Sequence, residues 1–360
     1  MSSHDFRKRI SETRRRMEKQ NLDVFLVTKP EDKYYLSGFE SSNFYIVITE
    51  KINFLLTDFR YLEAARKKCK EFKIITIDSQ YSVFDFLAKY DKMSIGIEEK
   101  HLTADGLKMM ESIFNPEKIF FAQNIIEDQR ITKDESEIIC IKKSAEIADN
   151  AFAFILRYVE PGISERELAL KIESFMKKEG ANKLSFDIIV ASGERSALPH
   201  GLASDRILQK GEFVTLDFGC IFDHYCSDMT RTIAIGNISE EKKEIYDIVK
   251  DAQQAALEKL KPGMPASLVD DIARERINRA GYGEYFGHGL GHGVGLEVHE
   301  APRLSPACHS HLCEGMVVTV EPGIYLTDKF GVRIEDLVVI TQQGIENLTT
   351  SNKELVVINS

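Results

Sequence analysis

The sequence lacks a long apolar run and an N-terminal signal segment. No uninterrupted apolar stretch approaches the roughly 18 residues that a membrane-spanning helix needs. The first ten residues, MSSHDFRKRI, contain no apolar core of the kind that signal peptides carry. We therefore expect a protein that neither spans nor binds a membrane and that lies in the cytoplasm.

A disulfide framework and a basic excess are also missing. Six cysteines, at 69, 140, 220, 226, 308 and 313, show no CxxC spacing, so they indicate reduced thiols. The formal net charge of -10 argues against nucleic acid or an anionic membrane as the main partner, because both require a basic surface. The one basic stretch, FRKRISETRRRMEKQ, has acidic residues interleaved and is typical of a solvated helix face.

The chain has 360 residues, which is too long for one ordinary core, so we expect two domains. In the first third, short apolar runs alternate with helical stretches. The expected strands are 21–28, 43–49, 52–57, 72–78, 93–98 and 118–122, and the expected helices are 59–69, 81–90 and 103–114. The runs 43–49 and 52–57 are spaced as a hairpin. Residues 1–124 are thus predicted to form an α/β domain with a mixed sheet, in which no residue group suggests catalysis.

An internal repeat marks the second predicted domain, residues 125–360. A helical pattern over 134–159 is followed by a second predicted helix, and the same order returns about a hundred residues later. The breaks match at a constant offset of 101: Pro161, Gly162 and Gly180 against Pro262, Gly263 and Gly281. Ser164 and Glu167 form a capping-box pattern in the first copy. We interpret the match as a duplication, with two halves related by a pseudo-two-fold axis.

Each half ends in two apolar strands that are interrupted by acids. In the first half, Asp217 and Asp228 oppose each other if paired residue numbers sum to 445, with the turn between Phe222 and Asp223. That register places both carboxylates on one face, with Cβ atoms about 5 Å apart. In the second half, Glu321 and Glu335 give a sum of 656 and a turn centred on Asp328.

Four carboxylates inside apolar strands repel one another unless a cation lies among them. Four oxygen ligand groups from two related hairpins suit two divalent ions about 3.5–4 Å apart. Such a set favours manganese, cobalt or iron over a thiolate zinc site. The alternative makes each acid the solvent-facing residue of an amphipathic strand, which explains any one of them better than all four.

The segment GHGLGHGVGLEVHE, residues 287–300, supplies the imidazoles that a metal pair commonly takes. His288 and His292 are four residues apart, but five glycines disfavour a helix by about 1 kcal/mol each. We expect a close-packed turn that runs into a strand, GLEVHE, with the glycines allowing close backbone approach. The segment fits neither GxGxxG nor HExxH. His200, in LPHG, is a further candidate, although a lone histidine beside proline is more typical of a loop.

Taken in order, LPHG, LDFG, SDMTRT, GHGLGHGVGLEVHE, VVTVEPGIY and VRIED closely resemble the pita-bread metallopeptidases. The resemblance is to the branch of Xaa-Pro dipeptidases (prolidases) and Xaa-Pro aminopeptidases, and it covers nearly the whole chain. YYLSGF and TDFRY resemble the creatinase-type N-terminal domain of that branch. The implied fold is α/β (α+β), with a creatinase-like N-terminal domain and a C-terminal pita-bread domain that has internal pseudo-two-fold symmetry.

The resemblance also implies roles for individual residues. The implied metal ligands are Asp217 for one ion, Asp228 and Glu335 as bridges, and His292 and Glu321 for the second ion. Glu321 would also be the proton-transferring base. His200 and His299 would contact substrate and stabilise charge on the scissile carbonyl oxygen, with His288 and Arg333 as supporting groups. The implied cofactor is a pair of divalent ions, manganese in the first place, with cobalt, iron or zinc as alternatives.

The expected activity is hydrolysis of the bond between an N-terminal residue and proline, by an Xaa-Pro dipeptidase or aminopeptidase. The expected partners are small peptides with proline second and a second copy of the chain in a homodimer. A methionine aminopeptidase or broader aminopeptidase explains the catalytic half but not the N-terminal domain. A non-catalytic pita-bread binding protein would have eroded ligands, and creatine-hydrolysing relatives lack this metal set, whereas all five metal positions are intact here.

Overall fold

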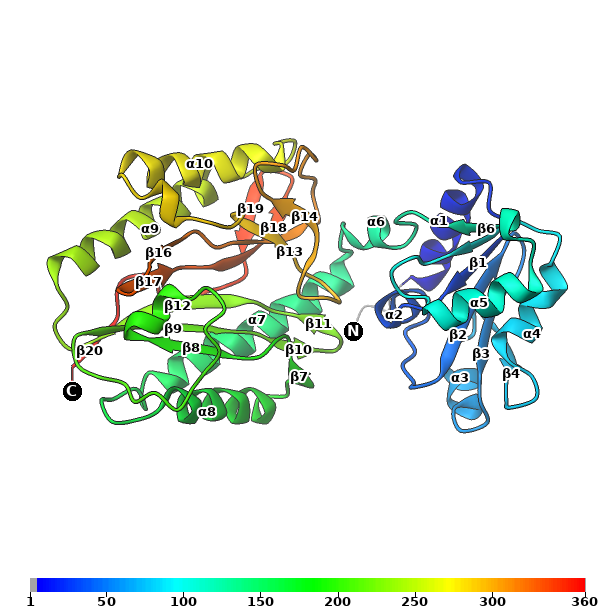
Figure 1. The fold of residues 1–360 in the computed structure, drawn as a ribbon, viewed down its shortest axis with the longest axis horizontal. Helices are drawn as coiled ribbons and strands as arrows, with labels where there is room; N and C mark the ends of the chain where they lie inside the picture. The colour runs from blue at the N-terminus through cyan, green and yellow to red at the C-terminus, as the bar shows by residue number, and fades with distance from the viewer. Residues whose placement is uncertain (1–4, 360) are drawn as a thin grey trace. The chain divides into compact units, whose positions relative to one another are not determined.

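The computed structural model describes residues 5–359 and divides into two compact units, Met1–Arg130 and Ile131–Ser360 (Figure 1). The boundary expected at 124/125 stays a prediction; the contacts divide the chain after helix α6 (Glu127–Arg130). Within residues 5–359, no helix combines the length and the apolar character that crossing a bilayer requires. All six cysteines lie in this range and are free thiols.

The first unit is built on a six-stranded sheet of order β4-β3-β2-β1-β5-β6. Its strands are β1 (Val24–Val27), β2 (Phe44–Thr49), β3 (Asn53–Thr57), β4 (Lys73–Thr76), β5 (Ile95–Ile97) and β6 (Ile119–Phe121). Its other helices are α1 (Phe6–Lys19), α2 (Pro30–Ser37), α3 (Leu62–Lys68), α4 (Val83–Leu87) and α5 (Ala104–Ile113). The predicted hairpin is present as the antiparallel pair β2–β3, and β3–β4, β1–β5 and β5–β6 are parallel, so the sheet is mixed as predicted.

Two features of the helices in this unit were not predicted. Helix α1 is not wholly solvated: Ile10 and Met17, seven residues apart on one face, are buried, and the buried Arg9 donates to Tyr35 O at 3.0 Å. The buried face of α1 is narrow, because the helix has few apolar residues. Helix α2 was not predicted, although proline at its first position and Gly38 at φ 64° after its end are its boundary signals.

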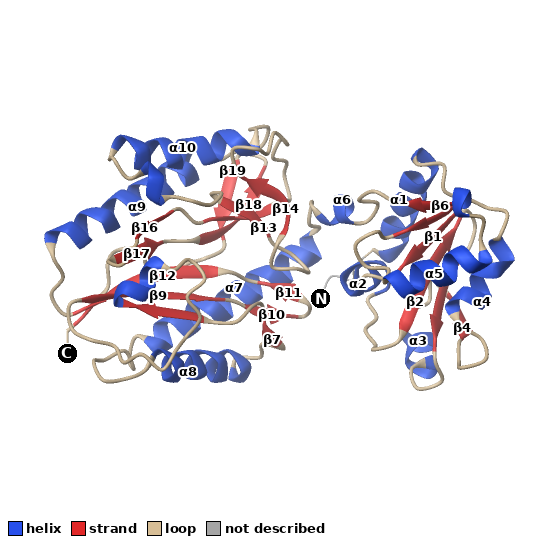
Figure 2. Cartoon of the chain, in the orientation of Figure 1, coloured by secondary structure: helices blue, strands red, loops and turns tan. Residues whose placement is uncertain are grey.

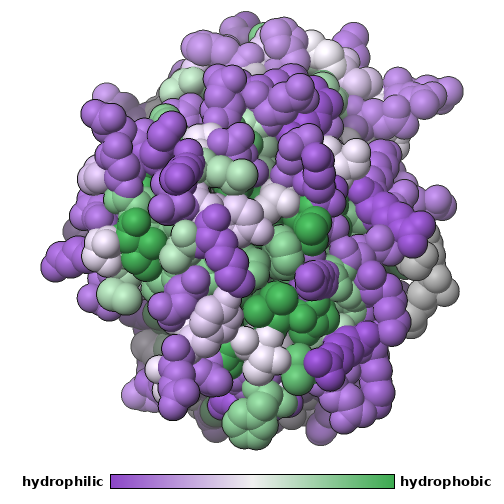
Figure 3. Space-filling model, turned by 90° about the vertical axis from the view of Figure 1, so that its right-hand side faces the viewer, coloured by the Kyte–Doolittle hydropathy of each residue, from purple (hydrophilic) through white to green (hydrophobic). Residues whose placement is uncertain are grey.

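The face of the molecule that Figure 3 shows is mainly hydrophilic, with groups of hydrophobic side chains toward its middle. The most exposed large hydrophobic side chain among the described residues is Phe59 of the first unit, at 80%. Single exposed apolar residues of this kind are common on folded proteins. This unit contributes no residue to the site described below.

The second unit contains two helix pairs with strands between them (Figure 2). The helices are α7 (Glu135–Ile155), α8 (Glu165–Lys178), α9 (Glu240–Lys259) and α10 (Ala266–Arg279). The first-half strands are β7 (Lys183–Leu184), β8 (Ile189–Ser192), β9 (Glu212–Phe218), β10 (Cys220–Phe222), β11 (Tyr225–Cys226) and β12 (Met229–Ile235). The others are β13 (Gly291–Gly293), β14 (Glu300–Leu304), β15 (Val317–Val320), β16 (Gly323–Leu326), β17 (Phe330–Arg333), β18 (Asp336–Thr341), β19 (Gly344–Asn347) and β20 (Val357–Ile358).

Each half of this unit has its own core. In one core, α7 and α8 pack on β9 and β12 through residues such as Ile172 and Leu216. In the other, α9 and α10 pack on the later strands through residues such as Val249 and Val318. The strand order is β20-β12-β9-β8 in the first half and β14-β13-β15-β18-β19 in the second. The central antiparallel pair β9–β12 corresponds to the pair β15–β18.

The predicted duplication is confirmed by the helices. Glu165–Lys178 and Ala266–Arg279 have the same length, and both ends differ by 101. The glycines that flank them have positive φ: Gly162 at 102°, Gly180 at 104°, Gly263 at 85° and Gly281 at 89°. The predicted capping box of Ser164 and Glu167 is present. The same backbone geometry thus begins and ends the corresponding helix in both halves.

Of the two predicted hairpin registers, one is correct and one is wrong. The predicted sum of 656 is correct for both β16–β17 and β15–β18. The predicted sum of 445 is wrong, because Thr230 pairs with Asp217 and the sum is 447. The turn consists of Asp223 and His224, with φ of 45° and 72°, which is the two-residue hairpin geometry with positive φ at both positions. A slip of two residues keeps Asp217 and Asp228 on one face as diagonal neighbours.

The predicted strand GLEVHE is also wrong. Residues 294–299 form an irregular segment between β13 and β14, with Gly295 N donating to Glu297 O at 3.0 Å. Gly293 explains the close packing, because a Cβ there would lie 2.2 Å from Ala301 O. The glycines therefore allow two backbone segments to approach, as expected, but the chain pairs as a strand only at Gly291–Gly293.

Candidate metal centre

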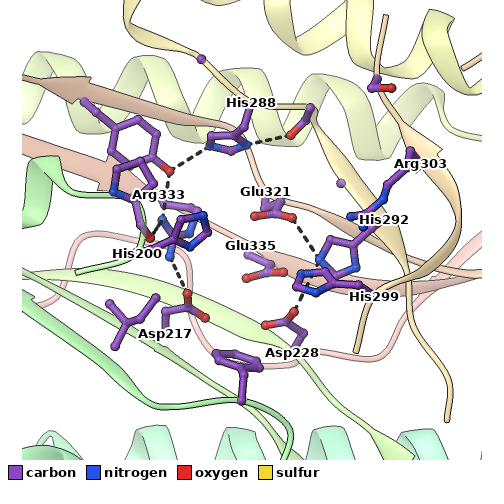
Figure 4. A pocket seen from close by; sticks show the side chains of 18 of the residues that line it. His200, Asp217, Asp228, His288, His292, His299, Arg303, Glu321, Arg333 and Glu335 are labelled. Carbon is purple, nitrogen blue, oxygen red and sulfur yellow. Dashed lines mark hydrogen bonds and ion pairs between the residues drawn. The ribbon is translucent and has the colours of Figure 1, made fainter. Parts of the chain in front are cut away.

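All nine residues that the sequence singled out line one cavity of about 1180 Å³ in the second unit (Figure 4). They are His200, Asp217, Asp228, His288, His292, His299, Glu321, Arg333 and Glu335. They come from the two hairpins, from β13 and the segments beside it, and from the loop that follows β8. Residues up to 135 positions apart are thus gathered by the fold around one space.

The acids and one imidazole converge at the centre of this cavity. His292 Nε2 lies 3.3 Å from Glu321 Oε1 and 3.6 Å from Asp228 Oδ2. One ligand atom each from Asp228, His292 and Glu335 lie within 4.8 Å of one another. Figure 4 shows these side chains pointing toward a common space, with Asp217 on its other side.

The backbone explains why the second hairpin opens at its two acids. The register of 656 would pair Glu321 with Glu335, but each donates its N–H to another segment. Glu321 N donates to Leu290 O at 2.8 Å, and Glu335 N donates to Thr230 O at 3.1 Å. The strands diverge there, so Glu321 lies beside β13 and Glu335 beside β12.

The electrostatics of this cluster are unfavourable for bare carboxylates. Burial and the charges of neighbouring carboxylates raise the pKa of Asp228 and of Glu335 well above their usual range. Burial also raises the pKa of Asp217, against the effect of Arg333. Burial alone would raise the pKa of Glu321, but the hydrogen bond and charge of His292 lower it to about 2. A cation among the acids would relieve this repulsion.

The residues fit a divalent metal ion. Asp217 Oδ1 and Glu335 Oε1 are buried acceptor oxygens without a hydrogen-bond donor within the described chain. His292 Nδ1 lies 3.1 Å from Gly293 O, and a proton on Nδ1 leaves Nε2 free to bind a metal. Carboxylate oxygens with one imidazole form a ligand set that divalent ions such as manganese accept.

Arg333 organises the oxygens that do not face this space. Its Nη2 donates to Asp217 Oδ2 at 2.5 Å, and its Nε donates to Thr230 Oγ1 at 3.1 Å. Thr230 in turn donates to Glu335 Oε2 at 2.7 Å. One buried guanidinium therefore orients two carboxylates, and in each it leaves the other oxygen without a donor.

His288 belongs to the same network through Tyr325. Arg333 Nη1 donates to Tyr325 Oη at 2.9 Å, and Tyr325 Oη lies 2.9 Å from His288 Nε2. Burial lowers the pKa of His288, so its neutral ring accepts a hydrogen bond from the Tyr325 hydroxyl at Nε2 and donates one from Nδ1 to Gly289 O at 2.8 Å. His288 is thus two hydrogen bonds away from the guanidinium that holds Asp217.

The other two histidines face the cavity from irregular segments. The His299 ring packs edge-on against His292, with centroids 4.4 Å apart. Burial, followed by the charge of His292, lowers the pKa of His299 to about 4. His200 is exposed to the cavity and follows Pro199, whose carbonyl accepts from Arg333 Nη1 at 3.2 Å. Both rings are placed to meet a bound molecule.

Three residues of the site were missed in the sequence. Thr230 is two positions beyond Asp228 and therefore shares its face, and Tyr325 follows the PGI of the second hairpin. Arg303 is the cross-strand partner of His292, so its side chain leaves the sheet on the same side and lines the cavity. Alternation along the strands could have found Thr230, whereas Arg303 required the pairing of β13 with β14.

Models of two protein families match the two parts of the chain. A family model described as metallopeptidase family M24 matches residues 139–342, and one described as the creatinase/prolidase N-terminal domain matches 9–132. The chain is 43% identical over 343 residues to the Xaa-Pro dipeptidase of Pyrococcus horikoshii, which covers 94% of this chain and 96% of that protein.

Solved structures are similar over nearly the whole chain. The Xaa-Pro dipeptidase from Bacillus anthracis matches with a TM-score of 0.95 and 41% identity, over 98% of this chain and all of that one. An X-Pro aminopeptidase from Thermotoga maritima matches with a TM-score of 0.88 and 40% identity, over 96% of this chain and all of that one. Overall identity is thus nearly the same for a dipeptidase and an aminopeptidase.

Proposed function

The chain belongs to metallopeptidase family M24, and we propose that it is a proline-specific dipeptidase that releases proline from Xaa-Pro. The observation that carries the proposal is the convergence of Asp228, His292 and Glu335 on one point of a cavity large enough for a peptide. Two relatives, at 43% and 41% identity, are named Xaa-Pro dipeptidases. The activity is peptide hydrolysis by a metallopeptidase.

The proposed ligand set holds two divalent ions, with manganese as the proposed metal. Asp217 would hold one ion, Asp228 and Glu335 would lie between both, and His292 with Glu321 would hold the other. When bound, the ions lower the pKa of water and polarise the scissile carbonyl. The buried oxygens without donors, Asp217 Oδ1 and Glu335 Oε1, support this assignment.

We assign proton transfer to Glu321. Its Oε1 already contacts Thr319 Oγ1 at 3.2 Å and His292 Nε2 at 3.3 Å, which leaves Oε2 for the reaction. Glu321 Oε2 would accept a proton from the attacking water and pass it to the leaving nitrogen. Because that nitrogen belongs to proline, it carries no N–H in the peptide and becomes a secondary amine on release.

The two cavity-facing histidines would act on the substrate carbonyl. His200 and His299 can each donate a ring N–H toward the oxygen on which charge develops. Neither ring has a side-chain hydrogen-bond partner among residues 5–359, so their donors are available. The low pKa of His299 keeps it a neutral donor.

Arg303 supports a dipeptidase over an aminopeptidase. It lies across from His292 in the β13–β14 pair and lines the cavity, and it forms no ion pair within the described residues. A free guanidinium there is placed to bind the carboxylate of a C-terminal proline. An aminopeptidase is the second candidate, because the cavity of about 1180 Å³ exceeds a dipeptide and a structure of that class is 40% identical.

Kinetics on matched peptides test this choice. We expect Ala-Pro to be hydrolysed at least about tenfold faster, in kcat/KM, than Ala-Pro-amide or Ala-Pro-Ala, since an ionic hydrogen bond contributes about 1.5–3 kcal/mol. Arg303→Gln should remove that preference mainly through KM, and Arg303→Lys should keep part of it. Equal rates on Ala-Pro and Ala-Pro-Ala in the wild type would favour the aminopeptidase.

The finer predictions from the sequence also belong here. We propose a homodimer, which sedimentation at several protein concentrations would test. We propose a cytoplasmic location, which fractionation of cells with an antibody to the chain would test. Manganese would be tested against cobalt, iron and zinc by reconstitution of metal-free enzyme.

A further inference from the structure

We propose that the buried Glu165 and the partly buried Arg195 form a clamp that positions His200 toward the substrate. Both residues lie outside the cavity lining, so the clamp acts through the loop of residues 193–203 and not by contact with substrate. The inference rests on the proposed function, because it takes His200 as a substrate-contacting group. Its test is arranged so that the two can fail separately.

Glu165 is a fully buried carboxylate at the start of α8, with a side-chain exposure of 0%. Oε1 accepts from Ser192 N and Oγ, both at 2.8 Å. Oε2 accepts from Ser204 N at 3.0 Å, Ser204 Oγ at 2.6 Å and Arg195 Nε at 3.1 Å. The first turn of a helix also favours a negative charge. One carboxylate thereby binds the residues just before and just after the loop.

Arg195 extends the clamp into the loop itself. Its Nη2 donates to Leu202 O at 2.6 Å, while its Nε is held by Glu165. Leu202 N in turn donates to His200 O at 2.9 Å, and Leu202 lines the cavity. The path from Glu165 to the His200 backbone therefore consists of three consecutive hydrogen bonds.

The His200 side chain has no such restraint of its own. Within the described residues no hydrogen bond to its ring is present, and the ring is exposed to the cavity. Its direction therefore depends on the loop backbone. A positioned donor loses its catalytic effect when it moves by about 1 Å.

The second half holds its histidine differently. At the offset of 101, Ala266 takes the place of Glu165. There His299 directly precedes β14, which pairs with β13, and Glu300 forms a buried ion pair with Lys133 at 3.2 Å. The His200 loop has no strand pairing beyond one bridge, Ile189 with Leu202. The clamp replaces in the first half what a strand and an ion pair supply in the second.

A double-mutant cycle on the full-length, metal-loaded enzyme tests the clamp. We expect Arg195→Met to lower kcat/KM on Ala-Pro about tenfold in the wild-type background and less than about twofold in the His200→Ala background. Metal content should stay unchanged in both. Arg195→Lys should recover part of the loss, because one ammonium can still reach Glu165 or Leu202 O.

Arg166→Met is the matched control. Arg166 is the next residue after Glu165 and pairs with Asp205, but both side chains are exposed, so this variant should keep wild-type kcat/KM. Glu165→Gln should repeat the Arg195→Met pattern with a larger effect. Because that variant removes a buried charge, its melting temperature must be measured, and Arg195→Met carries the test if it does not fold.

Two outcomes overturn the inference, and they are distinguishable. An equal loss from Arg195→Met with and without His200 would mean that the clamp acts on general stability and not through His200. A His200→Ala variant with normal kcat/KM would remove the role of His200 and the clamp with it. Failure of the proposed function has a separate readout, which is the absence of Ala-Pro hydrolysis by the metal-loaded wild type.

Discussion

The two halves of the second unit contain equivalent strands, but the residues around the acids of those strands differ. FVTLDFG, residues 213–219, corresponds to VVTVEPG, residues 317–323, at an offset of 104. Paired residue numbers sum to 447 in the first hairpin and to 656 in the second. The second strands of the two hairpins therefore correspond at an offset of 105. Asp217 and Glu321 are therefore equivalent positions, and both bear a carboxylate that lines the cavity.

The returning strands are where the halves diverge. At this offset Asp228 is equivalent to Arg333, and Thr230 is equivalent to Glu335. The second acid of the hairpin thus lies two residues later in the second half than in the first. The cation at the Asp228-equivalent position pairs with Asp217 in the other half. The duplication thus supplies the scaffold, and the departures from symmetry supply the complementary charges of the centre.

A fourth pair of equivalent positions also combines different residues in the two halves. Arg231 and Asp336 correspond at the offset of 105 and form an ion pair of 2.7 Å, with exposures of 1% and 0%. Arg231 also donates to Thr230 O and Glu335 O. A buried pair with further hydrogen bonds is costly to break from one side. Opposite charges at equivalent positions therefore hold the two halves together directly behind the metal centre.

The largest effect should come from Asp228→Asn, which removes a charge present only in the first half at this position. We expect loss of bound metal and a fall in kcat of about a thousandfold or more, because ions at such a site contribute several kcal/mol. Elemental analysis and Ala-Pro hydrolysis measure the two effects. Asp223→Asn, in the turn of the same hairpin, is the control and should retain metal. A fully metal-loaded and active Asp228→Asn variant would remove Asp228 from the centre.

The loss of kcat on replacing a histidine should be larger for the ring that lies closer to the proposed metal ligands. His299 packs on His292, whereas His200 is reached only through its loop. We expect His299→Ala to lower kcat about a hundredfold with metal still bound, and His200→Ala to cost less. Steady-state kinetics with parallel metal analysis distinguish this from ligand loss. Normal turnover by His299→Ala, or the reverse order, would contradict the comparison.

Substitution of alanine for two equivalent glycines should destabilise the protein to different extents. A Cβ on Gly219 would lie 1.9 Å from Ser227 O, a backbone atom, whereas a Cβ on Gly323 would meet the Tyr325 hydroxyl at 2.6 Å. The Tyr325 ring can shift at the cost of its hydrogen bonds to Arg333 and His288, whereas the Ser227 backbone is held in the hairpin. We therefore expect Gly219→Ala to reduce the free energy of unfolding by about 3 kcal/mol and Gly323→Ala by about 1–2 kcal/mol. Urea denaturation of both variants measures this, and equal losses would count against it.

Much of this architecture was predictable because its signals are local. Glycines at fixed spacing define both helix ends, and alternation along the strands places four acids on inward faces. The motifs resemble one family, so the creatinase-like and pita-bread domains were expected and are confirmed. The 656 register followed from a turn centred on one residue, Asp328, whose φ is 59°.

The errors arose where long-range packing decides. The predicted register of the first hairpin is wrong by two residues, because the chain turns at Asp223 and His224. The residue pattern alone does not locate that turn. GLEVHE alternates like a strand, but β13 pairs with β14 only as far as Gly293 and Glu300, with a register shift after His292, and residues 294–299 lie between the two strands. Arg303 and Glu165 carry no local signal at all, because their importance depends on partners that are distant in the sequence.

Titration of metal-free enzyme with manganese, followed by Ala-Pro hydrolysis, tests the central idea most directly. Activity should be absent after chelation, rise with added metal and level off at two ions per chain, and the Asp228→Asn variant should show no such rise. Full hydrolysis by protein that elemental analysis finds free of metal would contradict the account.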